Sequence, residues 1–155
     1  MLKAFPGNAE KLLHLADDVM GGAGELTRGE REAIAAFVSG LNNVGYCVHY
    51  HTLFSEVFCG PIAETNQRLE PLMCYAQRLC ASSDDGLDAT FQAARDAGWG
   101  ERALFEVVEI CGLFHYFNSI VRAAGLLQPD SLPEPLPTQS ELRGSYKAMA
   151  GALKG

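Results

Sequence analysis

The chain has 155 residues, 48% of them hydrophobic, and a formal net charge of −7 at pH 7. This length and composition predict one globular domain with a substantial core, and they exclude a disordered chain. The acidic balance, with no basic cluster to offset it, argues against a nucleic-acid-binding surface.

The cysteines and the first residues indicate a cellular compartment. The five cysteines are an odd number at irregular spacings, and residues 1–11 lack the apolar segment of a secretory signal. We therefore expect reduced thiols and a cytoplasmic protein. Residues 33–55 contain no Asp, Glu, Lys or Arg, but polar residues interrupt this stretch, so we expect no membrane span there and no membrane partner.

The first predicted helix begins after Asn8, a residue type suited to the N-cap, and ends at Gly21 and Gly22. A second helix follows from the T-x-x-E capping box formed by Thr27 and Glu30. Its apolar stripe has helical spacing and consists of Ile34, Phe37, Val38 and Leu41.

The opposite side of this second helix carries Glu32 among small residues such as Ala36 and Ser39. Small residues suggest that another helix approaches closely, which would place Glu32 in a partly buried seam. The alternative is an exposed first-turn glutamate favoured by the helix dipole. The spacing leaves both interpretations open.

Asn42 to Gly45 predicts a break, with a third helix beginning near Tyr46. Cys47 would then lie in the first turn, where free N–H groups and the dipole stabilise a thiolate. His51, four residues later, lies on the same helical face, and a thiol with a histidine one turn away is the minimum for an activated nucleophile. His49 points elsewhere on a helix, so we expect neither a metal nor a cofactor.

Further helices are predicted from Pro71, from Leu87 to Ala97, and from Glu101 to Gly125. The last is apolar nearly all round, which is typical of a helix buried within the fold or between subunits. In this helix His115 and Asn118 could line a pocket, although a core role is the simpler interpretation of His115. We interpret Cys74 and Cys80 as core or boundary thiols.

Residues 128–138 contain four prolines and predict an extended, polyproline-like linker after a helical domain of residues 1–127. A second capping box, Thr138 with Glu141, predicts a C-terminal helix from Gln139 to Lys154, within a segment of residues 139–155. A helix on an extended arm is well placed to dock on another subunit, so we expect a homo-oligomer.

The run LTRGEREAIAAFVSGLNNVGYCVHYHT resembles the carboxymuconolactone decarboxylase and alkylhydroperoxidase D (AhpD) superfamily, and looks most like its peroxidase-related branch. That family shows Leu-Thr-x-x-Glu-Arg-Glu and then Asn-x-Cys-x-Tyr-Cys-x-x-x-His. The segment AARDAGWGERALFEVVEICGLFHYFNSIVRAAGL is similar to a later family helix ending in Asn-Arg, with Ser119 in place of the arginine. The resemblance covers residues 8–127 and implies an all-α, AhpD-like helical bundle with a buried two-helix active-site core.

The resemblance also implies site residues. The family's second glutamate falls on Glu32, its second cysteine on Cys47 and its histidine on His51, which implies Cys47 as attacking thiol, Glu32 as general base and His51 as proton relay. The family's first cysteine, which resolves the sulfenate, is replaced by Val44. A resolving thiol would have to be external or be one of Cys59, Cys74, Cys80 and Cys111.

Three functions remain open. The first is a one-cysteine peroxidase in which Cys47 attacks a hydroperoxide, passes through a sulfenic acid and is restored by an external thiol. The second is a cofactor-free acid–base enzyme in which Glu32 and His51 move protons on a small carboxylate or lactone. The third is a non-catalytic helical oligomer that keeps the scaffold with a degenerate site.

Overall fold

The computed structural model describes residues 2–81 and 83–153, and over these residues it contains helices and no strand. In chain order the elements are the 3-10 helix η1 (Leu2–Ala4) and the α-helices α1 (Pro6–Gly21), α2 (Arg28–Leu41), α3 (Gly45–Cys59), α4 (Ile62–Leu79), α5 (Leu87–Asp96), α6 (Glu101–Ala123), α7 (Gln139–Arg143) and α8 (Ser145–Gly151). The all-α prediction is confirmed.

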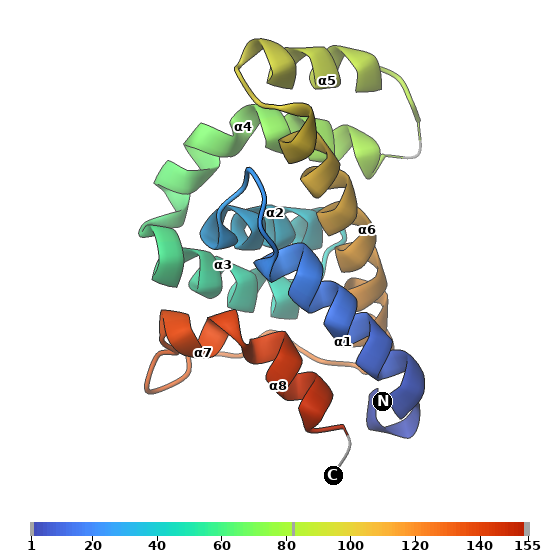
Figure 1. Ribbon diagram of the computed structural model, residues 1–155, viewed down its shortest axis with the longest axis vertical. Helices are drawn as coiled ribbons and strands as arrows, with labels where there is room; N and C mark the ends of the chain where they lie inside the picture. Colours follow the sequence, from blue (N-terminus) through green and yellow to red (C-terminus); the bar gives the residue numbers. More distant parts are fainter. Residues whose placement is uncertain (1, 82, 154–155) are drawn as a thin grey trace.

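Helices α2 and α3 form the centre of the molecule and pack along each other more extensively than any other pair. Figure 1 shows α4 and α5 at one end of this pair, α6 along its side, and α1, α7 and α8 at the other end. The turn between α2 and α3 contains Asn43 with a positive φ of 54°, which asparagine tolerates better than most residues. Two inner helices therefore lie side by side at the centre of the molecule, as the sequence predicts.

Helix α6 supplies much of the core. Its length and apolar composition would suit a membrane span, but its inner side chains pack against α2, α4 and α1. These side chains are buried and include Leu104, Val107, Ile110 and Phe114. The apolar character of α6 is accounted for by its position as a core helix.

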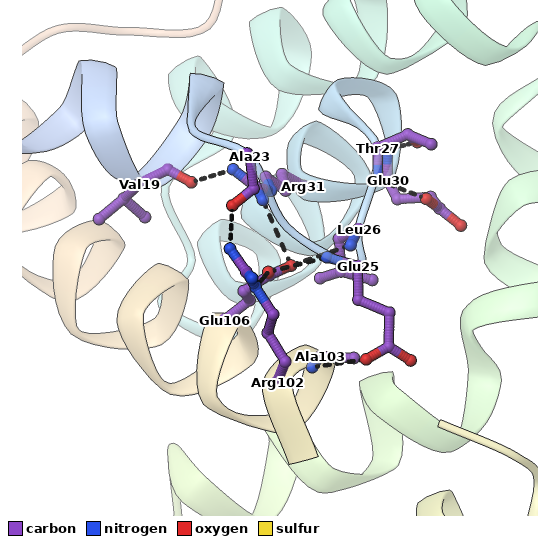
Figure 2. Close-up of polar contacts among 10 residues, drawn as sticks. All are labelled: Val19, Ala23, Glu25, Leu26, Thr27, Glu30, Arg31, Arg102, Ala103 and Glu106. Carbon is purple, nitrogen blue, oxygen red and sulfur yellow. Dashed lines mark hydrogen bonds and ion pairs between the residues drawn. The ribbon is translucent and has the colours of Figure 1, made fainter. Parts of the chain in front are cut away.

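A buried ion pair fixes the loop between α1 and α2 to α6 (Figure 2). Nη2 of Arg31 lies 3.3 Å from Oε2 of Glu106, and the Glu106 carboxylate accepts the backbone N–H groups of Glu25 and Leu26 at 3.0 and 2.9 Å. Arg31 also donates Nη1–H to the carbonyl of Val19 at 2.8 Å. These bonds set where α2 begins, and hence where its first turns lie in the core.

We expect Glu106→Gln to lower the free energy of unfolding by about 3 kcal/mol, because Arg31 would stay buried without its counter-charge. Urea unfolding followed by far-ultraviolet circular dichroism measures this. Glu109→Gln, on the same helix but partly exposed, is the matched control and should change the value by less than about 0.5 kcal/mol. Equal stability of the Glu106 and Glu109 variants would contradict the role given to the ion pair.

Two predicted helix starts are wrong. Helix α1 begins at Pro6, with Pro at its first position and Phe5 as N-cap, and not after Asn8. Helix α4 runs through Pro71 and does not begin there. A proline inside a helix costs about 3 kcal/mol, but Leu69 and Leu72 on either side of it are both fully buried, and their packing holds the helix together.

The C-terminal segment folds back onto its own chain. The capping box of Thr138 and Glu141 is present, but Gly144 divides the predicted single helix into α7 and α8, and residues 154–155 lie outside the described part of the chain. Helix α8 packs against α1, and α7 against α3 (Figure 1). Docking of this segment on another subunit stays a prediction.

Candidate active site

The site begins in the seam between α2 and α3. Glu30 donates its N–H to the Thr27 hydroxyl, and Thr27 donates its N–H to the Glu30 carboxylate, so the predicted capping box is confirmed. Helix α3 packs closely along α2, and a side chain at Gly29 of α2 would collide with Cys59 and Phe58 of α3. Glu32 is consequently 0% exposed. The buried interpretation of Glu32 is correct, and the exposed one is wrong.

The buried Glu32 carboxylate is held by two basic side chains. Arg28, one turn earlier, donates Nε–H to Oε1 at 2.7 Å, and its Nη2 lies 2.7 Å from the same oxygen in an ion pair. Nδ1 of His51, from α3, lies 2.6 Å from Oε2. A carboxylate removed from water needs hydrogen bonds and an opposite charge, and here Arg28 supplies the charge.

This arrangement fixes the tautomer of His51. An ion-paired carboxylate only accepts hydrogen bonds, so Nδ1 carries the hydrogen, and Nε2 of the neutral ring carries the lone pair. Phe114 and Phe54 meet the imidazole edge-on, with ring centroids 4.6 and 5.6 Å away. The ring is therefore held in one orientation, with Nδ1 engaged and Nε2 left as a proton acceptor.

His51 lines a cavity of about 690 Å³ on the side of α3 that faces α6 and α8. Cys47 lines the same cavity, and most of the other walls are aromatic or aliphatic, including Tyr46, Tyr50, Phe54, Phe117 and Met149. Glu32 does not line it. The structure thus brings Cys47 and His51 to one cavity and places Glu32 directly behind the imidazole.

Cys47 is 5% exposed, and its environment differs from the one predicted. Its backbone N–H is already bonded to the carbonyl of Val44 at 3.1 Å. Burial raises the pKa of the Cys47 thiol to about 11, and a hydrogen bond with Ser39 opposes this only in part. The expectation of a stabilised thiolate at the start of α3 is wrong. The resting group is a neutral thiol that needs a base.

The alkylation rate of Cys47 by iodoacetamide should rise about tenfold per pH unit and level off only near pH 11, because the thiolate is the reactive form. Peptide mass spectrometry separates this rate from those of the other cysteines. The exposed Cys74 serves as the internal control for access of the reagent. A rate for Cys47 that is already constant from neutral pH upward would contradict the raised pKa.

The other four cysteines lie away from this cavity. Cys59 lines a different pocket, Cys74 is exposed, and Cys80 and Cys111 are not among the residues that line the cavity. Val44, at the position of the family's first cysteine, is buried at the N-cap of α3. No resolving thiol is therefore present in the cavity.

The sequence analysis does not assign two residues of the site. Arg28 lies four residues before Glu32, and helical spacing alone could have paired them. Tyr146 lines the cavity from α8, beyond the proline segment, and its ring centroid lies 5.4 Å from the Arg28 guanidinium. Burial, and then the negative charge of Glu32, raises the pKa of Tyr146 well above its usual range. Arg28 also donates to the carbonyl of Leu142 at 3.4 Å.

Two other candidates lie outside the cavity lining. Asn118 is buried and accepts a hydrogen bond from Ser39 at 3.1 Å. The core interpretation of His115 is wrong, because this side chain is exposed. Among the described residues, no group of three or more His, Cys, Asp or Glu side chains is arranged to hold a metal ion.

Two solved structures share this fold. A peroxidase-related protein from Ralstonia eutropha JMP134, described as an alkylhydroperoxidase AhpD core, superposes with a TM-score of 0.74 and 23% identity over 83% of this chain and 74% of its own. A peroxidase-related protein from Silicibacter sp. TM1040 gives 0.68 and 20% identity, over 77% and 69%. No model of a protein family matches the sequence, and no curated protein is similar to it. The chain therefore has the AhpD-like fold that its sequence predicts.

Proposed function

We propose that this protein reduces a hydroperoxide at Cys47, with His51 as the base and Glu32 as the residue that positions it. One observation carries the proposal. His51 and Cys47 line the same cavity, and Nδ1 of His51 lies 2.6 Å from Oε2 of the buried Glu32 behind it. The two cavity residues are one helical turn apart, so a substrate bound there meets thiol and imidazole together.

In the proposed step, Nε2 of His51 takes the thiol proton as Sγ of Cys47 attacks one peroxide oxygen. The S–O bond forms, the O–O bond breaks, and the leaving alkoxide receives the proton from the imidazolium. Cys47 becomes a sulfenic acid, and the peroxide is reduced by two electrons to an alcohol. Glu32 stabilises the transient imidazolium through Nδ1–H, a positioning role that replaces the general-base role implied by the family resemblance.

The walls of the cavity favour an organic hydroperoxide over a small polar one, because they are mainly aromatic and aliphatic. Because the cavity contains no other cysteine, an external thiol must attack the sulfenic sulfur and release water, and a second thiol must then restore Cys47. We therefore propose that the protein works in a reducing compartment such as the cytoplasm.

We expect His51→Ala to slow sulfenic acid formation at Cys47 by about 100-fold, the low end of the range for loss of a general base. Glu32→Gln should slow it by a smaller factor, because the ring remains but its orientation is weakened. The measurement is the rate of dimedone labelling of the Cys47 peptide after addition of cumene hydroperoxide. His49→Gln, on the same helix but outside the cavity lining, is the matched control and should match wild type.

Labelling of Cys47 at wild-type rate in His51→Ala would contradict the proposed mechanism. Absence of any label in the wild-type protein would contradict peroxide reduction at this site.

The raised pKa of Cys47 and the missing second cysteine favour one alternative, a cofactor-free acid–base enzyme. His51, backed by Glu32, would then move a proton on a small carboxylate or lactone, with Cys47 in the wall of the cavity. Activity that survives Cys47→Ser and is lost in His51→Ala would identify this class. If the wild-type protein shows neither activity and Cys47 is not labelled, the non-catalytic scaffold is the remaining interpretation.

We further propose that the protein self-associates. Phe105, Val108 and Tyr116 are exposed along one side of α6, and such an apolar stripe supports contact with a second copy. Multi-angle light scattering should give a molar mass that is a multiple of the 16.7 kDa chain. A mass of one chain at micromolar concentration would contradict self-association.

A further inference from the structure

A second pocket lies where the end of α1, the start of α2, the end of α3 and α7 meet, and it shares no lining residue with the cavity of Cys47. Its volume is about 450 Å³, and two arginines, Arg28 and Arg143, line it. None of the described residues in its lining is acidic. In a chain with a net charge of −7, this pocket is a local concentration of positive charge.

Arg28 directs one unused donor toward this pocket. Its side chain is 6% exposed, and its Nε and Nη2 both face the Glu32 carboxylate. The remaining nitrogen, Nη1, is buried and has no hydrogen-bond partner among the described residues. A Cβ at Gly21, which also lines the pocket, would lie 3.5 Å from Nη1. A buried donor on a charged group needs an acceptor, so Nη1 is suited to a ligand that carries one.

The first turn of α2 adds backbone donors to the same pocket. Thr27 accepts the N–H of Glu30 with its hydroxyl and the N–H of Arg31 with its carbonyl. Arg28 and Gly29 are the first two residues of this helix and line the pocket, and their N–H groups have no acceptor within the helix. The partial positive charge of a helix N-terminus also favours an anion there.

Arg143 supplies the charge that is not yet compensated. Its guanidinium lies 5.2 Å from the ring centroid of Phe58, and it forms no ion pair within the described part of the chain. The charge of Arg28 is already met by Glu32. One free positive charge matches a monoanion better than a dianion, and a guanidinium can bind both oxygens of a carboxylate.

The rest of the lining indicates an organic ligand. Met20, Leu26 and Phe58 give the pocket apolar walls, and its volume is within the range of about 300 to 1,000 Å³ typical of small-molecule sites. An inorganic ion would leave these walls without a partner.

We propose that this pocket binds an organic monocarboxylate. Nη1 of Arg28, the start of α2 and the guanidinium of Arg143 receive the carboxylate, and the apolar side chains contact the body of the ligand. The site is separate from Cys47 and does not depend on the function proposed there.

Cys59 lines the pocket and serves as a reporter of its occupancy. The full-length protein is titrated with sodium benzoate at constant ionic strength, and the rate of iodoacetamide labelling is followed for each cysteine peptide by mass spectrometry. We expect benzoate to slow the labelling of Cys59 several-fold and saturably, with no change at the exposed Cys74. Neutral benzamide and inorganic phosphate should protect Cys59 much more weakly.

Arg143→Gln should raise the benzoate concentration that gives half-protection about tenfold, because a charged hydrogen-bonding partner is lost. Lys147→Gln removes the same charge from an exposed residue of the C-terminal segment outside the pocket lining, and should match wild type. Gly21→Ala places a methyl group in ordinary contact with Nη1 of Arg28 and should weaken protection several-fold. Circular dichroism confirms that each variant is folded.

Unchanged labelling of Cys59 in benzoate would overturn the proposal, as would equal protection by benzamide or stronger protection by phosphate. Equal half-protecting concentrations in Arg143→Gln and Lys147→Gln would also overturn it. None of these results would bear on peroxide reduction at Cys47, whose labelling is measured separately.

Discussion

The buried carboxylate of Glu32 requires an opposite charge and hydrogen-bond donors, because removing it from water without them costs several kcal/mol. Arg28 supplies the opposite charge and one hydrogen bond, and His51 supplies a second hydrogen bond. Arg28 in turn is covered by the carbonyl of Leu142 and the ring of Tyr146. The C-terminal segment is therefore tied to the same charge that orients the imidazole, and the cavity wall and the site form one unit.

Burial decides the acidity of Cys47 more than its position on the helix does. Cys47 lies in the first turn of α3, where the helix dipole favours a thiolate. Burial nevertheless raises the pKa of its thiol to about 11. The dipole contributes about 0.3 to 1 kcal/mol, less than the 1.4 kcal/mol of one pKa unit, so burial outweighs it.

Local patterns in the sequence predict a large part of this structure. The capping boxes fix two helix starts, and the four-residue spacing of Cys47 and His51 brings both to one cavity. The sequence alone does not decide whether Glu32 is buried, because its burial depends on how closely α3 approaches α2. Tyr146 gives no local signal, since its place depends on the path of the chain after the proline segment. The continuation of α4 through Pro71 likewise depends on tertiary packing.

The central claim is that Glu32 holds His51 with its hydrogen on Nδ1 and its lone pair on Nε2. Nitrogen-15 NMR of the protein labelled at histidine, with His51 assigned from the signals missing in His51→Gln, measures this directly near neutral pH. The account predicts a protonated shift for Nδ1 and an unprotonated shift for Nε2, and loss of this preference in Glu32→Gln. A hydrogen on Nε2 of His51 in the wild-type protein, or no change in Glu32→Gln, would contradict it.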